Sequence, residues 1–144
     1  MGYVDKSLIK HTEGVIIPST YNNLPVKAIR ENAFESTGIS RAIIPNSITS
    51  IGKRAFANNP DLTKIIIPYN VNAIGDEAFS NCTKLSEIVF LSRGLFSCRK
   101  NNGIFANAGI NNESGCTLKC GYFVEKIPDR LFYPYTNGNA TPNL

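Results

Sequence analysis

The sequence predicts a repeat solenoid rich in β-structure, because one short pattern recurs along the chain at a nearly constant spacing. Residues 39–45 (ISRAIIP) and 62–68 (LTKIIIP) share the same apolar pattern 23 residues apart, and a third copy opens at residues 85–90 (LSEIVF). A second pattern, Ile-x-x-x-Ala-Phe, recurs between these strands and ends at Phe56 and again at Phe79. Self-similarity at a fixed period indicates stacked coils.

The length of the period indicates the class of solenoid. A repeat of about 20 to 29 residues with one short apolar strand per copy is typical of leucine-rich-repeat proteins. We therefore expect a right-handed superhelix of the α/β leucine-rich-repeat class, β-rich with short helical turns. Less regular copies downstream bring the total to about five coils, which are marked by Phe34, Phe56, Phe79, Phe105 and Phe132.

The repeat pattern also predicts the organisation of the chain. Residues 1–14 form an N-terminal lead-in, residues 15–135 the solenoid, and residues 136–144 a loop-like end. Leu144 could begin another strand, as Leu62 and Leu85 do, and an uncapped solenoid end exposes backbone and apolar core. We therefore expect this chain to be a piece of a longer repeat array.

The first and last coils depart from the regular pattern. The first has its strand at 15–18 and its aromatic turn at 29–34, with residues 21–25 (YNNLP) as a loop insertion. Such insertions cost little because closure entropy grows slowly with loop length. In the last coil, residues 118–132 match the pattern before Phe79 at an offset of 53, although Gly121 replaces the strand-ending proline.

The aromatic position should lie in the core. An isoleucine lies five residues before each clear Phe and an alanine immediately before it, as at Ile51, Ala55 and Phe56. A residue larger than alanine would collide with the neighbouring coil. We therefore predict that Phe34, Phe56 and Phe79 form a buried aromatic spine.

The alternation of strand residues predicts which side chains face solvent. In residues 62–68 the inward positions are Leu62, Ile65 and Ile67. The outward positions are Lys64, Ile66 and Pro68. Extending this register to the neighbouring coils gives a candidate binding face, which consists of Arg41, Ile43, Lys64, Ile66, Glu87 and Val89.

An exposed apolar row of this kind often marks a contact surface, and solenoids bind through extended faces. The outward β-branched column is Ile16, Ile43, Ile66 and Val89. The alternative is that these residues only hold the strands and are shielded by a flanking domain or by a partner coil.

The reactive groups argue against an enzyme. His11, in the lead-in, is the only histidine, and no Gly-x-Ser-x-Gly motif is present. Charged residues three positions before each Phe (Glu31, Lys53, Asp76) and two before it (Asn32, Arg54, Glu77) predict ladders of alternating sign between stacked coils. A carboxylate-based glycan hydrolase remains a weak alternative, and no cofactor is predicted.

The four cysteines have structural interpretations. Cys82 occupies the position of Thr37 and Asn59 in other coils, which suits a small group that bonds to turn backbone. Cys116 and Cys120 would lie roughly 13 Å apart in one strand, too far for a disulfide. They also lack the second ligand pair that zinc requires. Whether Cys98 pairs with Cys116 is left open.

Composition excludes several partners. The net charge is +4, and no basic cluster is longer than two residues, so neither nucleic acid nor a membrane surface is an expected partner. No apolar run reaches the roughly 18 residues of a membrane span. The first residues do not resemble a signal peptide. The protein is therefore either intracellular or a segment whose signal was removed, and we favour the second.

The full pattern Leu-x-x-Ile-x-Ile-Pro-x-x-Val-x-x-Ile-Gly-x-x-Ala-Phe-x-x-Cys-x-x-Leu over residues 62–85 resembles the BspA-type leucine-rich repeat. Residues 15–20 and 24–29 also resemble the start of such domains. The resemblance implies a secreted or cell-surface protein that adheres to host matrix or to other cells through a protein or glycan ligand. It supplies no catalytic residues. The alternative is a structural spacer without a ligand, and the oligomeric state stays open.

Overall fold

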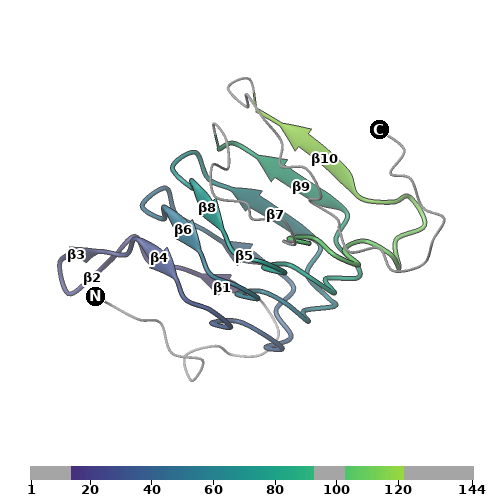
Figure 1. Cartoon of the computed structure of the whole chain (residues 1–144), viewed down its shortest axis with the longest axis horizontal. Helices are drawn as coiled ribbons and strands as arrows, with labels where there is room; N and C mark the ends of the chain where they lie inside the picture. Colours follow the sequence, from purple (N-terminus) through teal and green to yellow (C-terminus); the bar gives the residue numbers. More distant parts are fainter. Residues whose placement is uncertain (1–13, 93–102, 122–144) are drawn as a thin grey trace.

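A computed structural model describes residues 14–92 and 103–121, which form stacked coils (Figure 1). Each coil contributes one strand to a parallel sheet, the long sheet. Its strands are β1 (Val15–Ile16), β5 (Ala42–Ile43), β7 (Lys64–Ile67), β9 (Glu87–Phe90) and β10 (Thr117–Cys120). A parallel bridge between Arg41 and Lys64 joins β5 to β7. The arrangement confirms the predicted solenoid. Phe132, most of the lead-in and the loop-like end lie outside the described residues.

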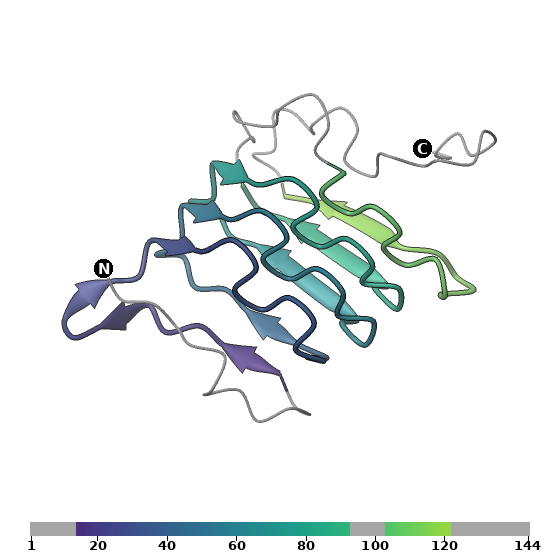
Figure 2. The same ribbon diagram turned by 60° about the horizontal axis from the view of Figure 1, so that its bottom comes forward.

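A second parallel sheet, the short sheet, lies on another side of the same coils (Figure 2). Its strands are β4 (Ala28–Ile29), β6 (Ser50–Ile51) and β8 (Ala73–Ile74). Each strand ends in the isoleucine that lies five residues before the aromatic position, and these isoleucines are buried. The short sheet therefore joins successive coils a second time, at the point in each coil between the long-sheet strand and the aromatic turn.

The insertion in the first coil is a β-hairpin and not the expected loop. Strand β2 (Thr20–Tyr21) pairs in antiparallel fashion with β3 (Leu24–Pro25). The two residues between them, Asn22 and Asn23, have φ angles of 49° and 62°. Positive φ at both central residues is characteristic of the type I′ turn, which asparagine tolerates and which matches the twist of the paired strands. The hairpin projects from the first coil (Figures 1 and 2).

The aromatic turns contain no helix within the described residues, so the expectation of short helical turns was wrong. Residues 31–36, 53–58, 76–81 and 104–111 are runs of hydrogen-bonded turns. The residues two positions before and two after each aromatic residue have positive φ, as in Arg54 (52°) and Asn58 (58°). A left-handed residue interrupts a right-handed helix, and here it recurs every four residues.

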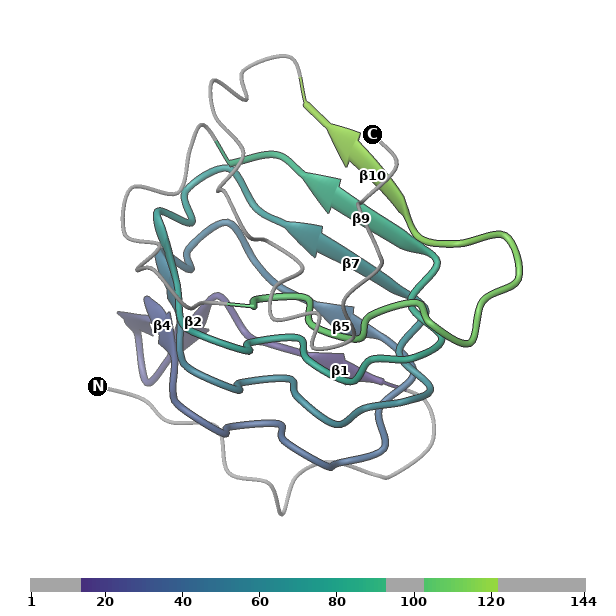
Figure 3. The same ribbon diagram turned by 45° about the vertical axis from the view of Figure 1, so that its right-hand side comes forward.

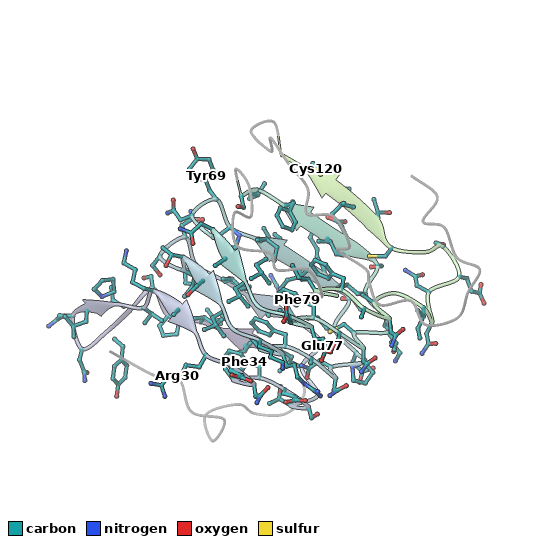
Figure 4. The ribbon with its side chains drawn as sticks, viewed as in Figure 1. Arg30, Phe34, Tyr69, Glu77, Phe79 and Cys120 are labelled. Atoms are coloured by element: carbon teal, nitrogen blue, oxygen red, sulfur yellow. The ribbon has the colours of Figure 1, made fainter. Side chains whose placement is uncertain are left out.

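The predicted aromatic spine is confirmed and extends to a fourth ring. Phe34, Phe56, Phe79 and Phe105 are all buried, and each neighbouring pair stacks with ring centroids 5.1 Å apart. That distance is close to the spacing of hydrogen-bonded strands, about 4.8 Å. The backbone follows the same register, since the Phe56 N–H donates to the Ala78 oxygen at 2.8 Å. Phe34 and Phe79 are labelled in Figure 4.

Strand alternation is confirmed except at its last position. The inward residues Leu62, Ile65 and Ile67 are fully buried, whereas Lys64 and Ile66 are exposed. Pro68, predicted to point outward, is buried. Strand β7 ends at residue 67, so the period of two no longer applies, and the chain turns there with a 3.2 Å bond from the Val71 N–H to the Pro68 oxygen.

The coils approach closely at two glycines. A Cβ added to Gly52 would lie 2.4 Å from the Glu31 nitrogen, and one added to Gly75 would lie 2.3 Å from the Lys53 nitrogen. Only glycine allows the backbones to come this close. Arg30 occupies the equivalent position in the first coil, where no earlier described coil lies against it.

Candidate binding face

The six residues predicted to form a binding face lie on the outward side of the long sheet, here called the sheet face. The strands that carry it run side by side in Figure 3. Parallel pairing places Ile16 beside Ile43 and Ile66 beside Val89. Ile16, Ile43 and Ile66 are 73%, 39% and 42% exposed, and Val89 is partly buried. The structure therefore brings the predicted apolar column together on an accessible surface.

A charged column runs beside the apolar one. Lys64 pairs in register with Glu87, and its Nζ lies 2.8 Å from Glu87 Oε1. Lys119 Nζ approaches the other oxygen, Glu87 Oε2, at 3.3 Å. A hydrogen bond from Lys64, and to a lesser degree one from Lys119, lowers the pKa of the Glu87 carboxyl. Arg41 lies in register with Lys64, and within the described part of the chain its guanidinium forms no ion pair.

Lys119 is a residue of the sheet face that the predicted set missed. It pairs in register with Val89, while its neighbour Leu118 pairs with Ile88. The offset of 53 residues that aligned 118–132 with the earlier repeat is thus confirmed for strand β10. The same alignment places Lys119 opposite the outward Ile66 column, so the signal for this residue was present in the sequence.

Exposed apolar side chains gather at this sheet. Of the eight large hydrophobic residues exposed in the described ranges, seven lie on the sheet face or beyond the C-terminal ends of its strands. They are Ile16, Tyr21, Leu24, Ile43, Ile66, Tyr69 and Leu91. Tyr69 lies in the turn that follows strand β7 (Figure 4), and Tyr21 and Leu24 belong to the hairpin. The exception is Ile110, in the last aromatic turn.

Charged side chains on the aromatic turns form ion pairs that link neighbouring coils. Arg54 donates from Nε to Glu35 Oε1 at 3.1 Å, and its Nη1 lies 3.6 Å from Glu77 Oε2. The predicted ladder two positions before the aromatic residue is therefore confirmed for Arg54 and Glu77. The ladder three positions before it stays a prediction, and none of its charged residues forms an ion pair among the described residues. Sequence reasoning missed Glu35.

An asparagine ladder was also missed. Asn107 Nδ2 donates to Asn81 Oδ1 at 2.9 Å, and Asn81 Nδ2 donates to Asn58 Oδ1 at 2.7 Å. The ladder ends where Asn58 Nδ2 donates to Glu35 Oε1 at 3.0 Å. All three asparagines lie two residues after a spine phenylalanine and have positive φ, which asparagine tolerates better than most residues. Their recurrence at this position was the available signal.

The polar position three residues after the aromatic one holds the coils together from inside. Asn59 Oδ1 accepts from the N–H groups of Thr37 (3.1 Å) and Gly38 (2.9 Å) in the preceding coil. Its Nδ2 donates to the oxygens of Phe34 and Phe56, both at 2.8 Å. Asn59 is fully buried, and Thr37, Phe34 and Phe56 are buried as well. The Asn59 amide therefore supplies partners for buried backbone groups of these residues.

Cys82 takes the same position in the next coil and fits the structural interpretation. Its Sγ donates to the Phe56 oxygen at 3.4 Å, and burial raises the pKa of the thiol to about 12. The thiolate is the reactive form of cysteine, so Cys82 is inert near neutral pH. Cys116 and Cys120 are free and not bonded to each other, as predicted. Cys98 lies outside the described residues.

Neither a metal site nor a membrane span is evident in residues 14–92 and 103–121. No three His, Cys, Asp or Glu side chains come together there in a group that could bind a metal ion. The same ranges contain no helix that is long and apolar enough to cross a membrane.

The chain is similar to several bacterial proteins of known structure. A leucine-rich repeat protein from Bacteroides capillosus is 31% identical, with 83% of each chain covered and a TM-score of 0.59. One from Bacteroides ovatus is 29% identical over 67% of this chain and 29% of that chain, with a TM-score of 0.51. A leucine rich repeat protein from T. pallidum, 24% identical over 74% of this chain and 51% of that chain, shares the fold with a TM-score of 0.51.

A comparison with curated proteins gives no match. A family model described as BspA type leucine rich repeat region (6 copies) matches residues 14–110, about two thirds of the chain. The match covers the regular coils, the hairpin and the first four rings of the aromatic spine. Together with the repeat pattern and the stacked parallel strands, it shows that this chain belongs to the BspA-type leucine-rich-repeat family.

Proposed function

We propose that the chain is a non-enzymatic module, secreted or displayed at the cell surface, that binds a protein or glycan of a host or neighbouring cell through the sheet face. The observation that carries the proposal is the exposed column of Ile16, Ile43 and Ile66 on adjacent parallel strands. Repeat solenoids present extended binding surfaces. Proteins of this family are typically secreted or found at the surface, and they are generally non-catalytic.

Strand formation alone does not require this column. β-Branched residues favour strands because they fit a pleated surface, and threonine meets that requirement without exposing a purely apolar side chain. The chain uses threonine on an outward strand position at Thr117. Isoleucine at three successive outward positions therefore supports a role in contact, since exposed apolar rows commonly mark interaction surfaces.

The sheet face is tested by charging its centre. We expect the purified chain to bind surfaces coated with extracellular-matrix proteins or intact cells. The double variant Ile43→Asp and Ile66→Asp should lose this binding and keep its circular-dichroism spectrum. The matched control is Ile110→Asp, because Ile110 is 55% exposed and lies on an aromatic turn away from the sheet face. Binding that survives the double change would refute the proposal.

The spacer alternative predicts a different result. A structural spacer would show no binding to any of these surfaces, with or without the aspartates. The glycan hydrolase alternative is tested by assaying glycan cleavage before and after Glu77→Gln. Glu77 lies beside Arg54 in an ion pair that links two coils, which gives this carboxylate a structural role.

A further inference from the structure

The charges of the sheet face are not balanced within the described chain. Three cations point outward on it, Arg41, Lys64 and Lys119, and the described residues supply a single carboxylate, Glu87. Asp61, which directly precedes Leu62 in the same coil, is engaged elsewhere, since it pairs with Lys84 at 2.7 Å. An excess of positive charge therefore lies beside the apolar column.

Glu87 shows how one carboxylate serves two cations on this surface. Its two oxygens lie 2.8 Å from Lys64 Nζ and 3.3 Å from Lys119 Nζ, so it bridges groups from strands on either side. At the other end of the column, Arg41 and Lys64 lie in register on adjacent strands with the same charge. Like charges directly opposite each other are destabilising. A carboxylate from outside would relieve that repulsion.

We propose that the partner is a protein whose contact segment places an aspartate or glutamate between Arg41 and Lys64 and apolar side chains against Ile43 and Ile66. The inference rests on the proposed function and names the partner's chemistry. Arg suits this task because its planar guanidinium binds a carboxylate with two parallel hydrogen bonds. The apolar column runs alongside the cations over the same strands. A peptide that crosses the strands between the two columns, with apolar and acidic residues in alternation, points its apolar side chains toward one column and its carboxylates toward the other. A sulfated glycan matches only the charged column.

The test uses three probes with the whole chain. Two are fluorescent octapeptides, one with alternating Val and Glu and one with alternating Val and Lys, measured by anisotropy, and the third is heparin. We expect the Val-Glu peptide to bind at least about tenfold more tightly than the Val-Lys peptide at low salt. The preference should shrink between about 0.05 M and about 0.5 M salt, because salt screens exposed charges.

Charge reversal locates the contact. Arg41→Glu should weaken Val-Glu binding at least about fivefold. The matched control, Lys53→Glu, makes the same change at an exposed position on an aromatic turn and should leave the affinity unchanged. Equal loss in both variants would mean that only the net charge matters, which overturns the inference.

The remaining outcomes separate this inference from the proposed function. Equal affinity for the two peptides, no binding of either, or tight binding of heparin alone would each overturn the acidic-protein inference. Cell or matrix binding that still depends on Ile43 and Ile66 would then leave the proposed function standing. If the double aspartate variant keeps that binding, the sheet face itself is not the site.

Discussion

The aromatic turns and the sheet face are two sides of the same coils, and they use the same register differently. On the turns, the aromatic position is phenylalanine in every described coil, and the position two residues after it is asparagine in three of them. On the sheet face the charged position changes from Arg41 to Lys64 to Glu87. Position-by-position contact between coils therefore constrains these turn positions, whereas the charged column of the sheet face keeps its geometry and varies its chemistry.

The difference has a physical cause. On the turn side the spine and ladder residues must fit against the coil before them and the coil after them, with their polar groups bonded to one or both. Outward side chains of the long sheet contact neighbours only at their edges and otherwise meet solvent. Changes at the spine and ladder positions should therefore cost stability, and changes on the sheet face should alter binding.

The largest expected effect is in the spine. Phe56→Ala removes a fully buried ring that stacks on Phe34 and on Phe79. Phe→Ala substitutions in cores cost about 3–5 kcal/mol, so we expect a loss of this size in the free energy of unfolding, measured by denaturant titration. A loss below about 1 kcal/mol would show that the rings do not hold the coils together.

The next effect concerns the buried amide. Asn59→Ala removes the acceptor of the Thr37 and Gly38 N–H groups, and it leaves the Phe34 oxygen with the Thr37 hydroxyl as its remaining side-chain donor. Each unsatisfied buried group costs about 1–3 kcal/mol, and part of this cost can be relieved by water, so we expect a loss of about 3 kcal/mol. Asn70→Ala, which removes one exposed bond to the Asn46 oxygen, is the control and should cost less than about 1 kcal/mol.

A smaller effect is expected at the close approach of two coils. Gly75→Ala forces a Cβ to within 2.3 Å of the Lys53 nitrogen, so the backbones must separate. Overpacking typically costs about 1–3 kcal/mol, which a thermal melt would detect. Gly38→Ala is the comparison, because Gly38 has φ of 71° but open space around its Cα. Gly75 itself has no positive φ, so backbone strain is not expected there, and a Gly75→Ala variant that melts like the wild type would contradict the close approach of the coils.

The smallest effect lies on the sheet face. The pKa of Glu87 is lowered in the folded chain, so its contribution to stability is present above its unfolded pKa and is lost as the pH falls through the folded pKa. In melts between pH 7 and pH 3, the wild type should be slightly more stable than Glu87→Gln at neutral pH and lose that advantage in acid. A constant difference across this range would contradict the assigned ion pairs.

The sequence predicts best where one coil repeats another. The spine and the alternation of strand β7 follow from period alone, because identical residues in stacked coils occupy identical environments. The sequence analysis missed local backbone structure where one or two residues decide it. Asn22 and Asn23 allow a two-residue turn that makes the insertion a hairpin, and Pro68 is buried because its strand ends one residue earlier.

The contacts of Asn59 and the glycines could not be read from the period. Asn59 differs in type from Thr37 and Cys82 at the same position, and its partners are backbone groups that no pattern displays. The close approach at Gly52 and Gly75 depends on the distance between coils. The positions of the candidate face were predictable by alternation, but its charge pairs were not, because they depend on how long side chains bend toward neighbouring strands.

Bonding between successive coils in a fixed register has an evolutionary consequence. Duplication of one repeat unit in the gene would add one coil, and with it one strand, to the long sheet, which would lengthen by about 4.8 Å. The new strand would bring one new pair of outward residues. Every older strand would keep its neighbours or exchange them for near-identical ones. The solenoid could thus lengthen by unequal recombination, and the outward residues of each added strand could then change without altering the buried core beneath them.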